Sequence, residues 1–375
     1  MKLNEYIFSA AALVLSVCGC SRASGTDETA DDLNPQFLSI EALHEGGYSL
    51  VSISPFDGSR DTLAVKRPMN RLVVMSTSYI GFLDAVDGCS AVVGVSGIEY
   101  VCDSAIASRA ARGEVADVGF DASPDYEKIL ALKPDLLLTY SVSPVKSRFL
   151  SKLESLGIRV FIVNEHLERH PVARAAYVRL FGALVGDMAA ADSVLSAVTQ
   201  RYCSVRDSVR MSASRKKAKT ASGRKVLVNI PYNDQWFIPG QENYLSNLVK
   251  DAGGEILGSE PGKAASSTVS IERAYSLAKD ADLWLNVGWC RTADDLVSAN
   301  PLFADFLARI KDNAAGRGYS GKVVWNDDKR LNAKGGNDFW ESGVVHPDIL
   351  LEDLIAVFGA DGTEEKETSY FRAVE

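Results

Sequence analysis

The sequence predicts an α/β protein with two Rossmann-like α/β lobes joined by a long interlobe helix and a ligand cleft between the lobes. Two observations indicate the lobes. Short apolar strands alternate with helices from Arg71 to Val163, and the same alternation returns from Lys225 to Phe358. A third observation indicates the helix. Between the two series, over 171–214, no strand signal occurs and apolar residues recur at helical spacing. This pattern fits one long kinked helix or two consecutive helices.

Strands alternating with helices favour mostly parallel sheets that are covered on both faces. The 375 residues are 46% hydrophobic and 24% charged, which is ample for two lobes that each bury a core. The formal net charge of −9 argues against a nucleic-acid partner, because such partners require a basic surface.

Residues 1–19 have the architecture of a signal peptide. Lys2 precedes an apolar run over 7–17 that is too short for a permanent membrane span, and the small residue Gly19 before Cys20 suits cleavage of a lipoprotein precursor. We expect the lipid on Cys20, a polar, acidic tether over 20–34, and a protein exported and anchored to a bacterial membrane, facing the periplasm or the cell surface. An uncleaved signal with an incidental cysteine is the alternative.

The remaining chain divides into segments of different character. Alternating stretches over 48–53 and 62–65, on either side of Asp57-Gly58, are typical of a β-hairpin. We assign 35–68 to an N-terminal β extension, 69–168 to an N-terminal lobe, 169–215 to the interlobe helical segment, 224–360 to a C-terminal lobe and 361–375 to a charged tail that should be frayed.

The cysteines and histidines indicate neither a metal site nor a catalytic site. Cys89, Cys102, Cys203 and Cys290 lie outside metal-ligand spacings. In an exported protein Cys89 and Cys102 are the preferred disulfide because they lie in one local region, with free buried thiols as the alternative. No GxSxG, P-loop or HExxH motif occurs, so we predict no catalytic residue and no resident metal or cofactor.

One short motif occurs in each half of the chain. Glu127 lies in the first turn of a predicted helix that leads to the strand 135–138, and Glu272 has the corresponding place before the strand 282–285. A carboxylate is favoured near a helix N-terminus, where the helix dipole keeps it ionised. Each lobe therefore presents one such carboxylate. The simplest role for each is to stabilise its own helix.

The order of these motifs resembles the periplasmic binding proteins of ABC importers for iron-siderophores, haem and cobalamin, of the helical-backbone type. The resemblance covers about 71–358 and is carried by the stretches 127–138, 153–163 and 269–285. It implies a monomeric binding protein without enzymatic activity that delivers its ligand to a permease dimer in the inner membrane. In that family an acidic residue on each lobe meets permease arginines, and Glu127 and Glu272 match those positions.

Ligands of open α/β sheets bind outside the carboxyl ends of the strands. Aromatic and basic residues follow the predicted strands, and stiff aromatic faces suit a flat, bulky metal chelate such as a ferric siderophore, haem or cobalamin. An exported hydrolase and a scavenging lipoprotein without a permease are the alternative functions. The expected ligand-binding residues are Tyr79, Tyr100, Tyr140, Tyr232, Trp236, Trp289, Arg291, Arg330, Phe339 and Trp340.

Overall fold

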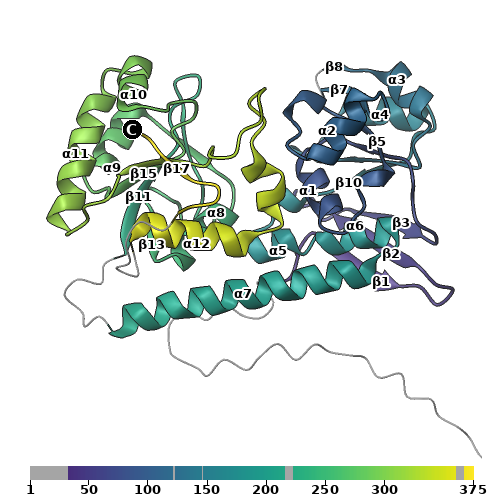
Figure 1. Ribbon diagram of the computed structural model, residues 1–375, viewed down its shortest axis with the longest axis horizontal. Helices are drawn as coiled ribbons and strands as arrows, with labels where there is room; N and C mark the ends of the chain where they lie inside the picture. The colour runs from purple at the N-terminus through teal and green to yellow at the C-terminus, as the bar shows by residue number, and fades with distance from the viewer. Residues whose placement is uncertain (1–32, 121–122, 146, 216–222, 360–366) are drawn as a thin grey trace, which may run out of the picture.

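The computed structural model describes residues 33–120, 123–145, 147–215, 223–359 and 367–375. It contains two α/β lobes, and one long helix, α7 (Met188–Arg215), runs beneath both of them (Figure 1). The predicted fold class is therefore confirmed. Among the described residues, no helix combines the length and the apolar character needed to cross a bilayer.

The N-terminal lobe is built on a parallel five-stranded sheet with the order β10-β9-β4-β5-β6. Its central strands are buried on both faces, which explains why they read as continuous apolar runs rather than alternating ones. The strands are β4 (Leu72–Val74), β5 (Val92–Val95), β6 (Ala116–Asp117), β9 (Leu136–Thr139) and β10 (Val160–Ile162), and a small hairpin joins β7 (Gly119–Phe120) to β8 (Ser123–Pro124). The helices are α1 (Ser78–Asp84), α2 (Ser104–Ala111), α3 (Tyr126–Leu132) and α4 (Arg148–Ser155).

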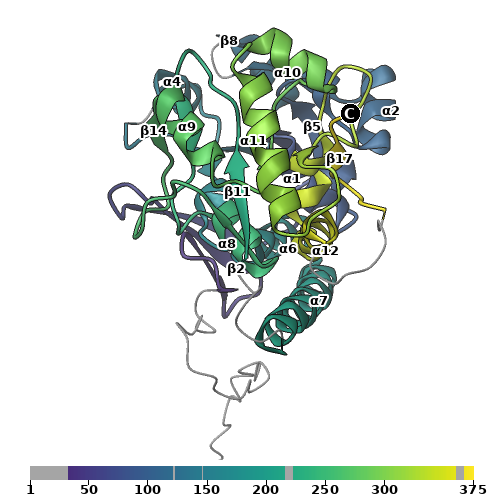
Figure 2. The same cartoon turned by 90° about the vertical axis from the view of Figure 1, so that its left-hand side faces the viewer.

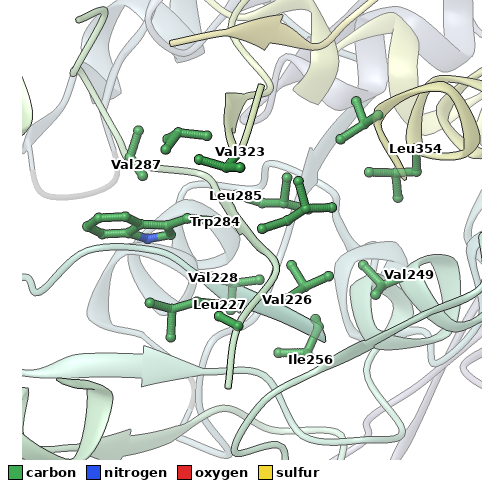
Figure 3. Packing of buried hydrophobic residues seen from close by; sticks show 14 of the residues in the cluster. Val226, Leu227, Val228, Val249, Ile256, Trp284, Leu285, Val287, Val323 and Leu354 are labelled. Carbon is green, nitrogen blue, oxygen red and sulfur yellow. The ribbon is translucent and has the colours of Figure 1, made fainter. Parts of the chain in front are cut away.

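The C-terminal lobe repeats this plan with the sheet order β13-β11-β15-β16-β17. Its core packs Val226 and Val228 of β11 against Leu285 of β15, with Val249 and Leu354 contributed by helices (Figure 3). The strands are β11 (Arg224–Val228), β13 (Gly254–Ile256), β15 (Leu283–Leu285), β16 (Val324–Asn326) and β17 (Arg372–Ala373), and β12 (Trp236–Ile238) pairs with β14 (Ser267–Val269) outside this sheet. The helices are α8 (Tyr244–Asp251), α9 (Ile271–Ala278), α10 (Ala293–Ala299), α11 (Phe303–Gly316) and α12 (Pro347–Phe358).

The end of the chain is ordered, contrary to the prediction of a frayed tail. Strand β17 pairs antiparallel with β16, and Tyr370 and Phe371 are each only 1% exposed. The carboxylate of Asp353 accepts hydrogen bonds from the backbone N–H groups of Ser369 and Tyr370. Burial of two aromatic side chains outweighs the polar character of the segment, so residues 367–375 belong to the C-terminal lobe.

The N-terminal extension is a three-stranded antiparallel sheet of β1 (Leu38–Ala42), β2 (Tyr48–Ile53) and β3 (Arg60–Val65). The predicted hairpin corresponds to β2 and β3, and β1 was not predicted. The Glu168 carboxylate ties the start of this sheet to the interlobe region, because it accepts hydrogen bonds from the N–H groups of Gln36 and Phe37 at 2.9 and 3.0 Å.

The interlobe segment contains α5 (Pro171–Ala175), α6 (Val178–Val185) and α7. Gly186 ends α6 in a left-handed conformation with φ 85°, which separates α6 from α7. Helix α7 contacts α6 near one end and α8 and α12 of the C-terminal lobe farther along its length, all from the side that faces the lobes (Figures 1 and 2). A single helix therefore supports both lobes.

Candidate functional site

A pocket of about 420 Å³ lies at the carboxyl ends of the N-terminal lobe strands. Parallel strands end at one edge of their sheet, so the loops that follow β4, β5 and β9 meet there. This is the edge at which the sequence predicted a ligand. The lining residues are Met75, Ser76, Thr77, Ser96, Gly97, Tyr100, Phe120 and Tyr140.

Gly97 makes the aromatic wall of this pocket possible. Its φ of 66° is left-handed, and a Cβ at this position would lie 2.6 Å from the ring of Phe120. The Asp117 carboxylate holds the neighbouring backbone, because Oδ1 accepts from the N–H groups of Gly97 and Gly119 at 3.2 Å each. A larger residue at 97 would displace the aromatic ring that it now approaches.

Two rings of the wall are exposed although they are aromatic. Tyr100 is 39% exposed and Phe120 51%, and their ring centroids lie 6.1 Å apart. Tyr140 is half-buried and meets the edge of His166 at 5.8 Å. Exposed aromatic surface beside a pocket is typical of a site that an apolar ligand covers. Phe120 was missed by the sequence reading, because no strand was predicted there.

The C-terminal lobe also presents aromatic side chains after its strands. Trp289 follows β15 and is 64% exposed. The Asn326 amide shapes its loop, since it accepts from the N–H of Val287 at 2.6 Å and donates to the carbonyls of Gly288 and Cys290 at 2.8 and 2.9 Å. An almost fully buried side chain thus fixes the loop that presents Trp289.

Tyr232, after β11, is 71% exposed. It precedes a tight turn in which Asn233 and Asp234 both have positive φ, and its backbone exchanges two hydrogen bonds with Gln235. The predictions that Tyr232 and Trp289 lie at strand ends with accessible side chains agree with the structure.

A polar chain leads from the pocket to the C-terminal lobe. The hydroxyl of Ser76 lies 2.8 Å from that of Ser78, which donates to Oε1 of Glu165 at 2.8 Å. Arg174 donates through Nε to Oε2 of Glu165 at 2.5 Å. Both Glu165 and Arg174 are buried, so each offsets the cost of burying the other's charge.

Arg174 also contacts aromatic side chains of the other lobe. Its guanidinium lies 4.9 Å from the ring centre of Tyr244 and 5.9 Å from that of Trp340. Trp340 remains 41% exposed. The sequence reading proposed Trp340 but missed Glu165, Arg174 and Tyr244, because nothing in the local pattern shows that these distant positions converge.

Residues 330–342, which we call the strap, connect the C-terminal lobe to the N-terminal lobe. The Asn332 amide donates to the carbonyls of Glu99 and Val101, both at 2.9 Å. The Glu341 carboxylate accepts from the N–H groups of Cys102 and Asp103 at 2.8 and 2.6 Å. Burial raises the pKa of Glu341 to about 7. The strap therefore holds the segment 99–103, which carries Tyr100 of the pocket.

Three predicted ligand contacts are wrong, because the side chains lie in cores. Tyr79 is fully buried in α1, where its ring packs against Phe181. Trp236 is fully buried and stacks on Trp284 at 6.0 Å. Phe339 is 3% exposed. Each is large and apolar, so its burial stabilises the fold and leaves no surface for a ligand.

The predicted basic residues have different surroundings. Arg330 forms an ion pair with Asp338 at 2.8 Å and lines a second pocket, of about 380 Å³, between the strap and α1–α2. Arg330 is therefore not part of the first pocket. Arg291 is exposed in the loop after β15, and its N–H donates to Asp295.

The predicted disulfide between Cys89 and Cys102 is absent, and both cysteines are free thiols. Each sulfur instead contacts a backbone carbonyl at 3.9 Å, that of Ile80 for Cys89 and that of Tyr100 for Cys102. Burial raises the pKa of Cys102 to about 12, so this thiol is held protonated. Closeness in the sequence did not bring the two sulfurs together.

Glu127 and Glu272 are exposed in the first turns of α3 and α9, one in each lobe. Asp125 caps α3 through the N–H of Lys128. Ser270 caps α9, and its hydrogen bond lowers the pKa of Glu272. Within the described part of the chain, no group of three His, Cys, Asp or Glu side chains is arranged to hold a metal.

The chain matches the family model described as periplasmic binding protein over residues 72–313. It is 24% identical over 318 residues to an uncharacterized lipoprotein of Methanocaldococcus jannaschii, covering 81% of this chain and 68% of that protein.

Two solved structures share the fold. A periplasmic heme binding protein from Pseudomonas aeruginosa superposes with a TM-score of 0.57 at 16% identity, covering 82% of this chain and 98% of its own. An ABC transporter substrate-binding protein from Listeria monocytogenes superposes with a TM-score of 0.53 at 18% identity, covering 78% and 99%. The chain belongs to the periplasmic binding protein family, which consists of binding proteins rather than enzymes.

Proposed function

We propose that this protein captures a metal chelate, either an iron complex or a corrinoid, between its two lobes and delivers it to an ABC permease. The observation that carries the proposal is the pocket at the carboxyl ends of the N-terminal lobe strands, where Tyr100, Phe120 and Tyr140 present aromatic surface. Such walls suit a broad, rigid ligand, because they offer a large contact area at a small entropic cost.

The second wall of the binding site is contributed by the C-terminal lobe. Trp289 and Tyr232 follow the carboxyl ends of β15 and β11, as the pocket residues follow theirs. A chelate larger than the pocket would extend from the N-terminal lobe toward these rings. Burying the exposed aromatic surface on both lobes supplies the apolar part of the affinity, at about 25 cal/mol per Å².

The permease contacts proposed here are Glu127 and Glu272. Both carboxylates are exposed at the starts of short helices in different lobes, so two well-separated charges can pair with arginines of a permease dimer. Paired charges of this kind set the docking register and the rate of encounter more than the affinity. The lipid on Cys20 would keep the protein at the membrane surface, although that residue lies outside the described residues.

Binding and transport can be tested separately. Cyanocobalamin, ferrichrome and haemin are titrated into the protein, and tryptophan fluorescence reports binding through Trp289 and Trp340. One chelate per chain should bind, without turnover, and replacing Phe120 and Tyr140 together by Ala should abolish binding. Saturation at the same affinity in that double variant would disprove the proposed site.

A further inference from the structure

We propose that the site selects chelates that carry no net negative charge and rejects anionic ones. The proposal rests on the proposed function and narrows its ligand class. It is derived from the charges around the pocket. The pocket walls carry aromatic rings and hydroxyl groups, and every basic side chain considered for the site has an acidic neighbour.

None of the described residues that line the pocket is basic. Ser76, Thr77 and Ser96 supply hydroxyl groups, which can hydrogen-bond to amide, hydroxamate or water oxygens of a neutral ligand. An anionic ligand would need Arg or Lys to replace the water that it loses on binding. The pocket offers hydrogen bonds to such a ligand but no compensating charge.

The buried basic residue of the polar chain is already paired. Arg174 donates to Glu165 at 2.5 Å, and Glu165 in turn receives the hydroxyl of Ser78. Both charged side chains are more than nine-tenths buried. Withdrawing Arg174 to bind a ligand would leave the Glu165 carboxylate buried and unpaired, which is strongly unfavourable.

The other basic candidates also have carboxylates nearby. Arg330 pairs with Asp338 at 2.8 Å. Hydrogen bonds from the backbone N–H groups of Arg291 and Thr292 lower the pKa of Asp295, and the positive charge of Arg291 lowers it further. In α3, Lys128 pairs with Asp125 at 3.2 Å.

Carboxylates, in contrast, lie beside both halves of the site. Asp117 holds the backbone of Gly97 in the pocket wall. Asp327 follows β16 at the carboxyl edge of the other sheet, close enough to Tyr244 to influence its titration. Burial, and after it the neighbouring Asp328, raise the pKa of Asp327 to about 6. The charged groups around the site therefore offer an anion no net attraction.

The test uses pairs of chelates that differ in charge. Cyanocobalamin is compared with the carboxylic acids formed by hydrolysis of its side-chain amides, and ferrichrome with the strongly anionic ferric enterobactin. In whichever pair binds, we expect the uncharged chelate to bind at least about tenfold more tightly than the anionic one, which corresponds to about 1.4 kcal/mol. Equal or tighter binding of the anionic member would overturn the inference and leave the proposed function standing. Failure of every chelate to bind would instead count against the proposed function.

A variant pair tests the same inference from the protein side. Thr77→Lys adds a cation to the pocket wall, and Thr77→Met adds similar bulk without charge. We expect Thr77→Lys to improve the affinity for the anionic member at least about tenfold relative to Thr77→Met. The same affinity in both variants, with both shown to be folded by circular dichroism, would contradict the inference. The wild-type measurements decide the matter if either variant fails to fold.

Discussion

Replacing Glu341 by Gln tests how the strap holds the two lobes together. The Glu341 side chain is 2% exposed, and its carboxylate accepts the N–H groups of Cys102 and Asp103 from the other lobe. Burial is the main reason that its pKa rises from 4.5 to about 7, and the negative charges of Asp338 and Asp103 add to the rise. A rise of about 2.5 units corresponds to about 3 kcal/mol.

The sign of the effect follows from the direction of the pKa shift. The folded protein binds this proton more tightly than the unfolded chain, so protonation favours the folded state. The contribution is complete below pH 4.5 and is lost as the pH rises through about 7. The amide introduced by Glu341→Gln does not titrate, so the stability of the wild type relative to this variant should fall by about 3 kcal/mol over this range.

Urea unfolding at pH values of about 4.5 and 8 measures this difference. The control is Glu41→Gln, a change at an exposed position of β1, whose difference from the wild type should stay nearly constant. If the wild type and Glu341→Gln differ by the same free energy at both pH values, folding does not raise the pKa of Glu341, and the link between burial and pH-dependent stability is refuted.

Three further changes test other parts of the structure. Trp236→Ala should lower the free energy of unfolding by about 3–5 kcal/mol and leave chelate affinity unchanged, because its ring is buried outside the pocket; calorimetry and titration check both. Deleting residues 368–375 should cost about 3–6 kcal/mol, from the loss of buried Tyr370 and Phe371, in a urea unfolding experiment. Replacing Glu127 and Glu272 by Ala should abolish uptake without weakening chelate binding, and unchanged uptake would refute their role in docking.

The lobes were predictable because their signals are local. Apolar strand runs such as 136–139 depend on neighbouring residues alone. The same holds for the first-turn positions of Glu127 and Glu272. Where a parallel sheet is built from such units, the edge that carries the pocket follows from the strand direction.

The site was only partly predictable, because its side chains come from distant parts of the chain. Tyr79 and Tyr100 both follow strands, yet the first faces the core and the second the pocket. Glu165 and Arg174 meet across the turn that precedes α5, and Tyr244 joins them from the C-terminal lobe. The tail was misjudged for the same reason, since only its pairing with β16 shows that Phe371 is buried.

The central claim is that one metal chelate binds between the aromatic pocket of the N-terminal lobe and the strand-end loops of the C-terminal lobe. Anomalous scattering from crystals grown with a bound chelate locates the metal directly. The proposed function predicts one metal peak per chain, between Tyr140 and the loop of Trp289. A metal peak at the second pocket or on the outer surface, or crystals without bound metal at saturating chelate, would contradict it.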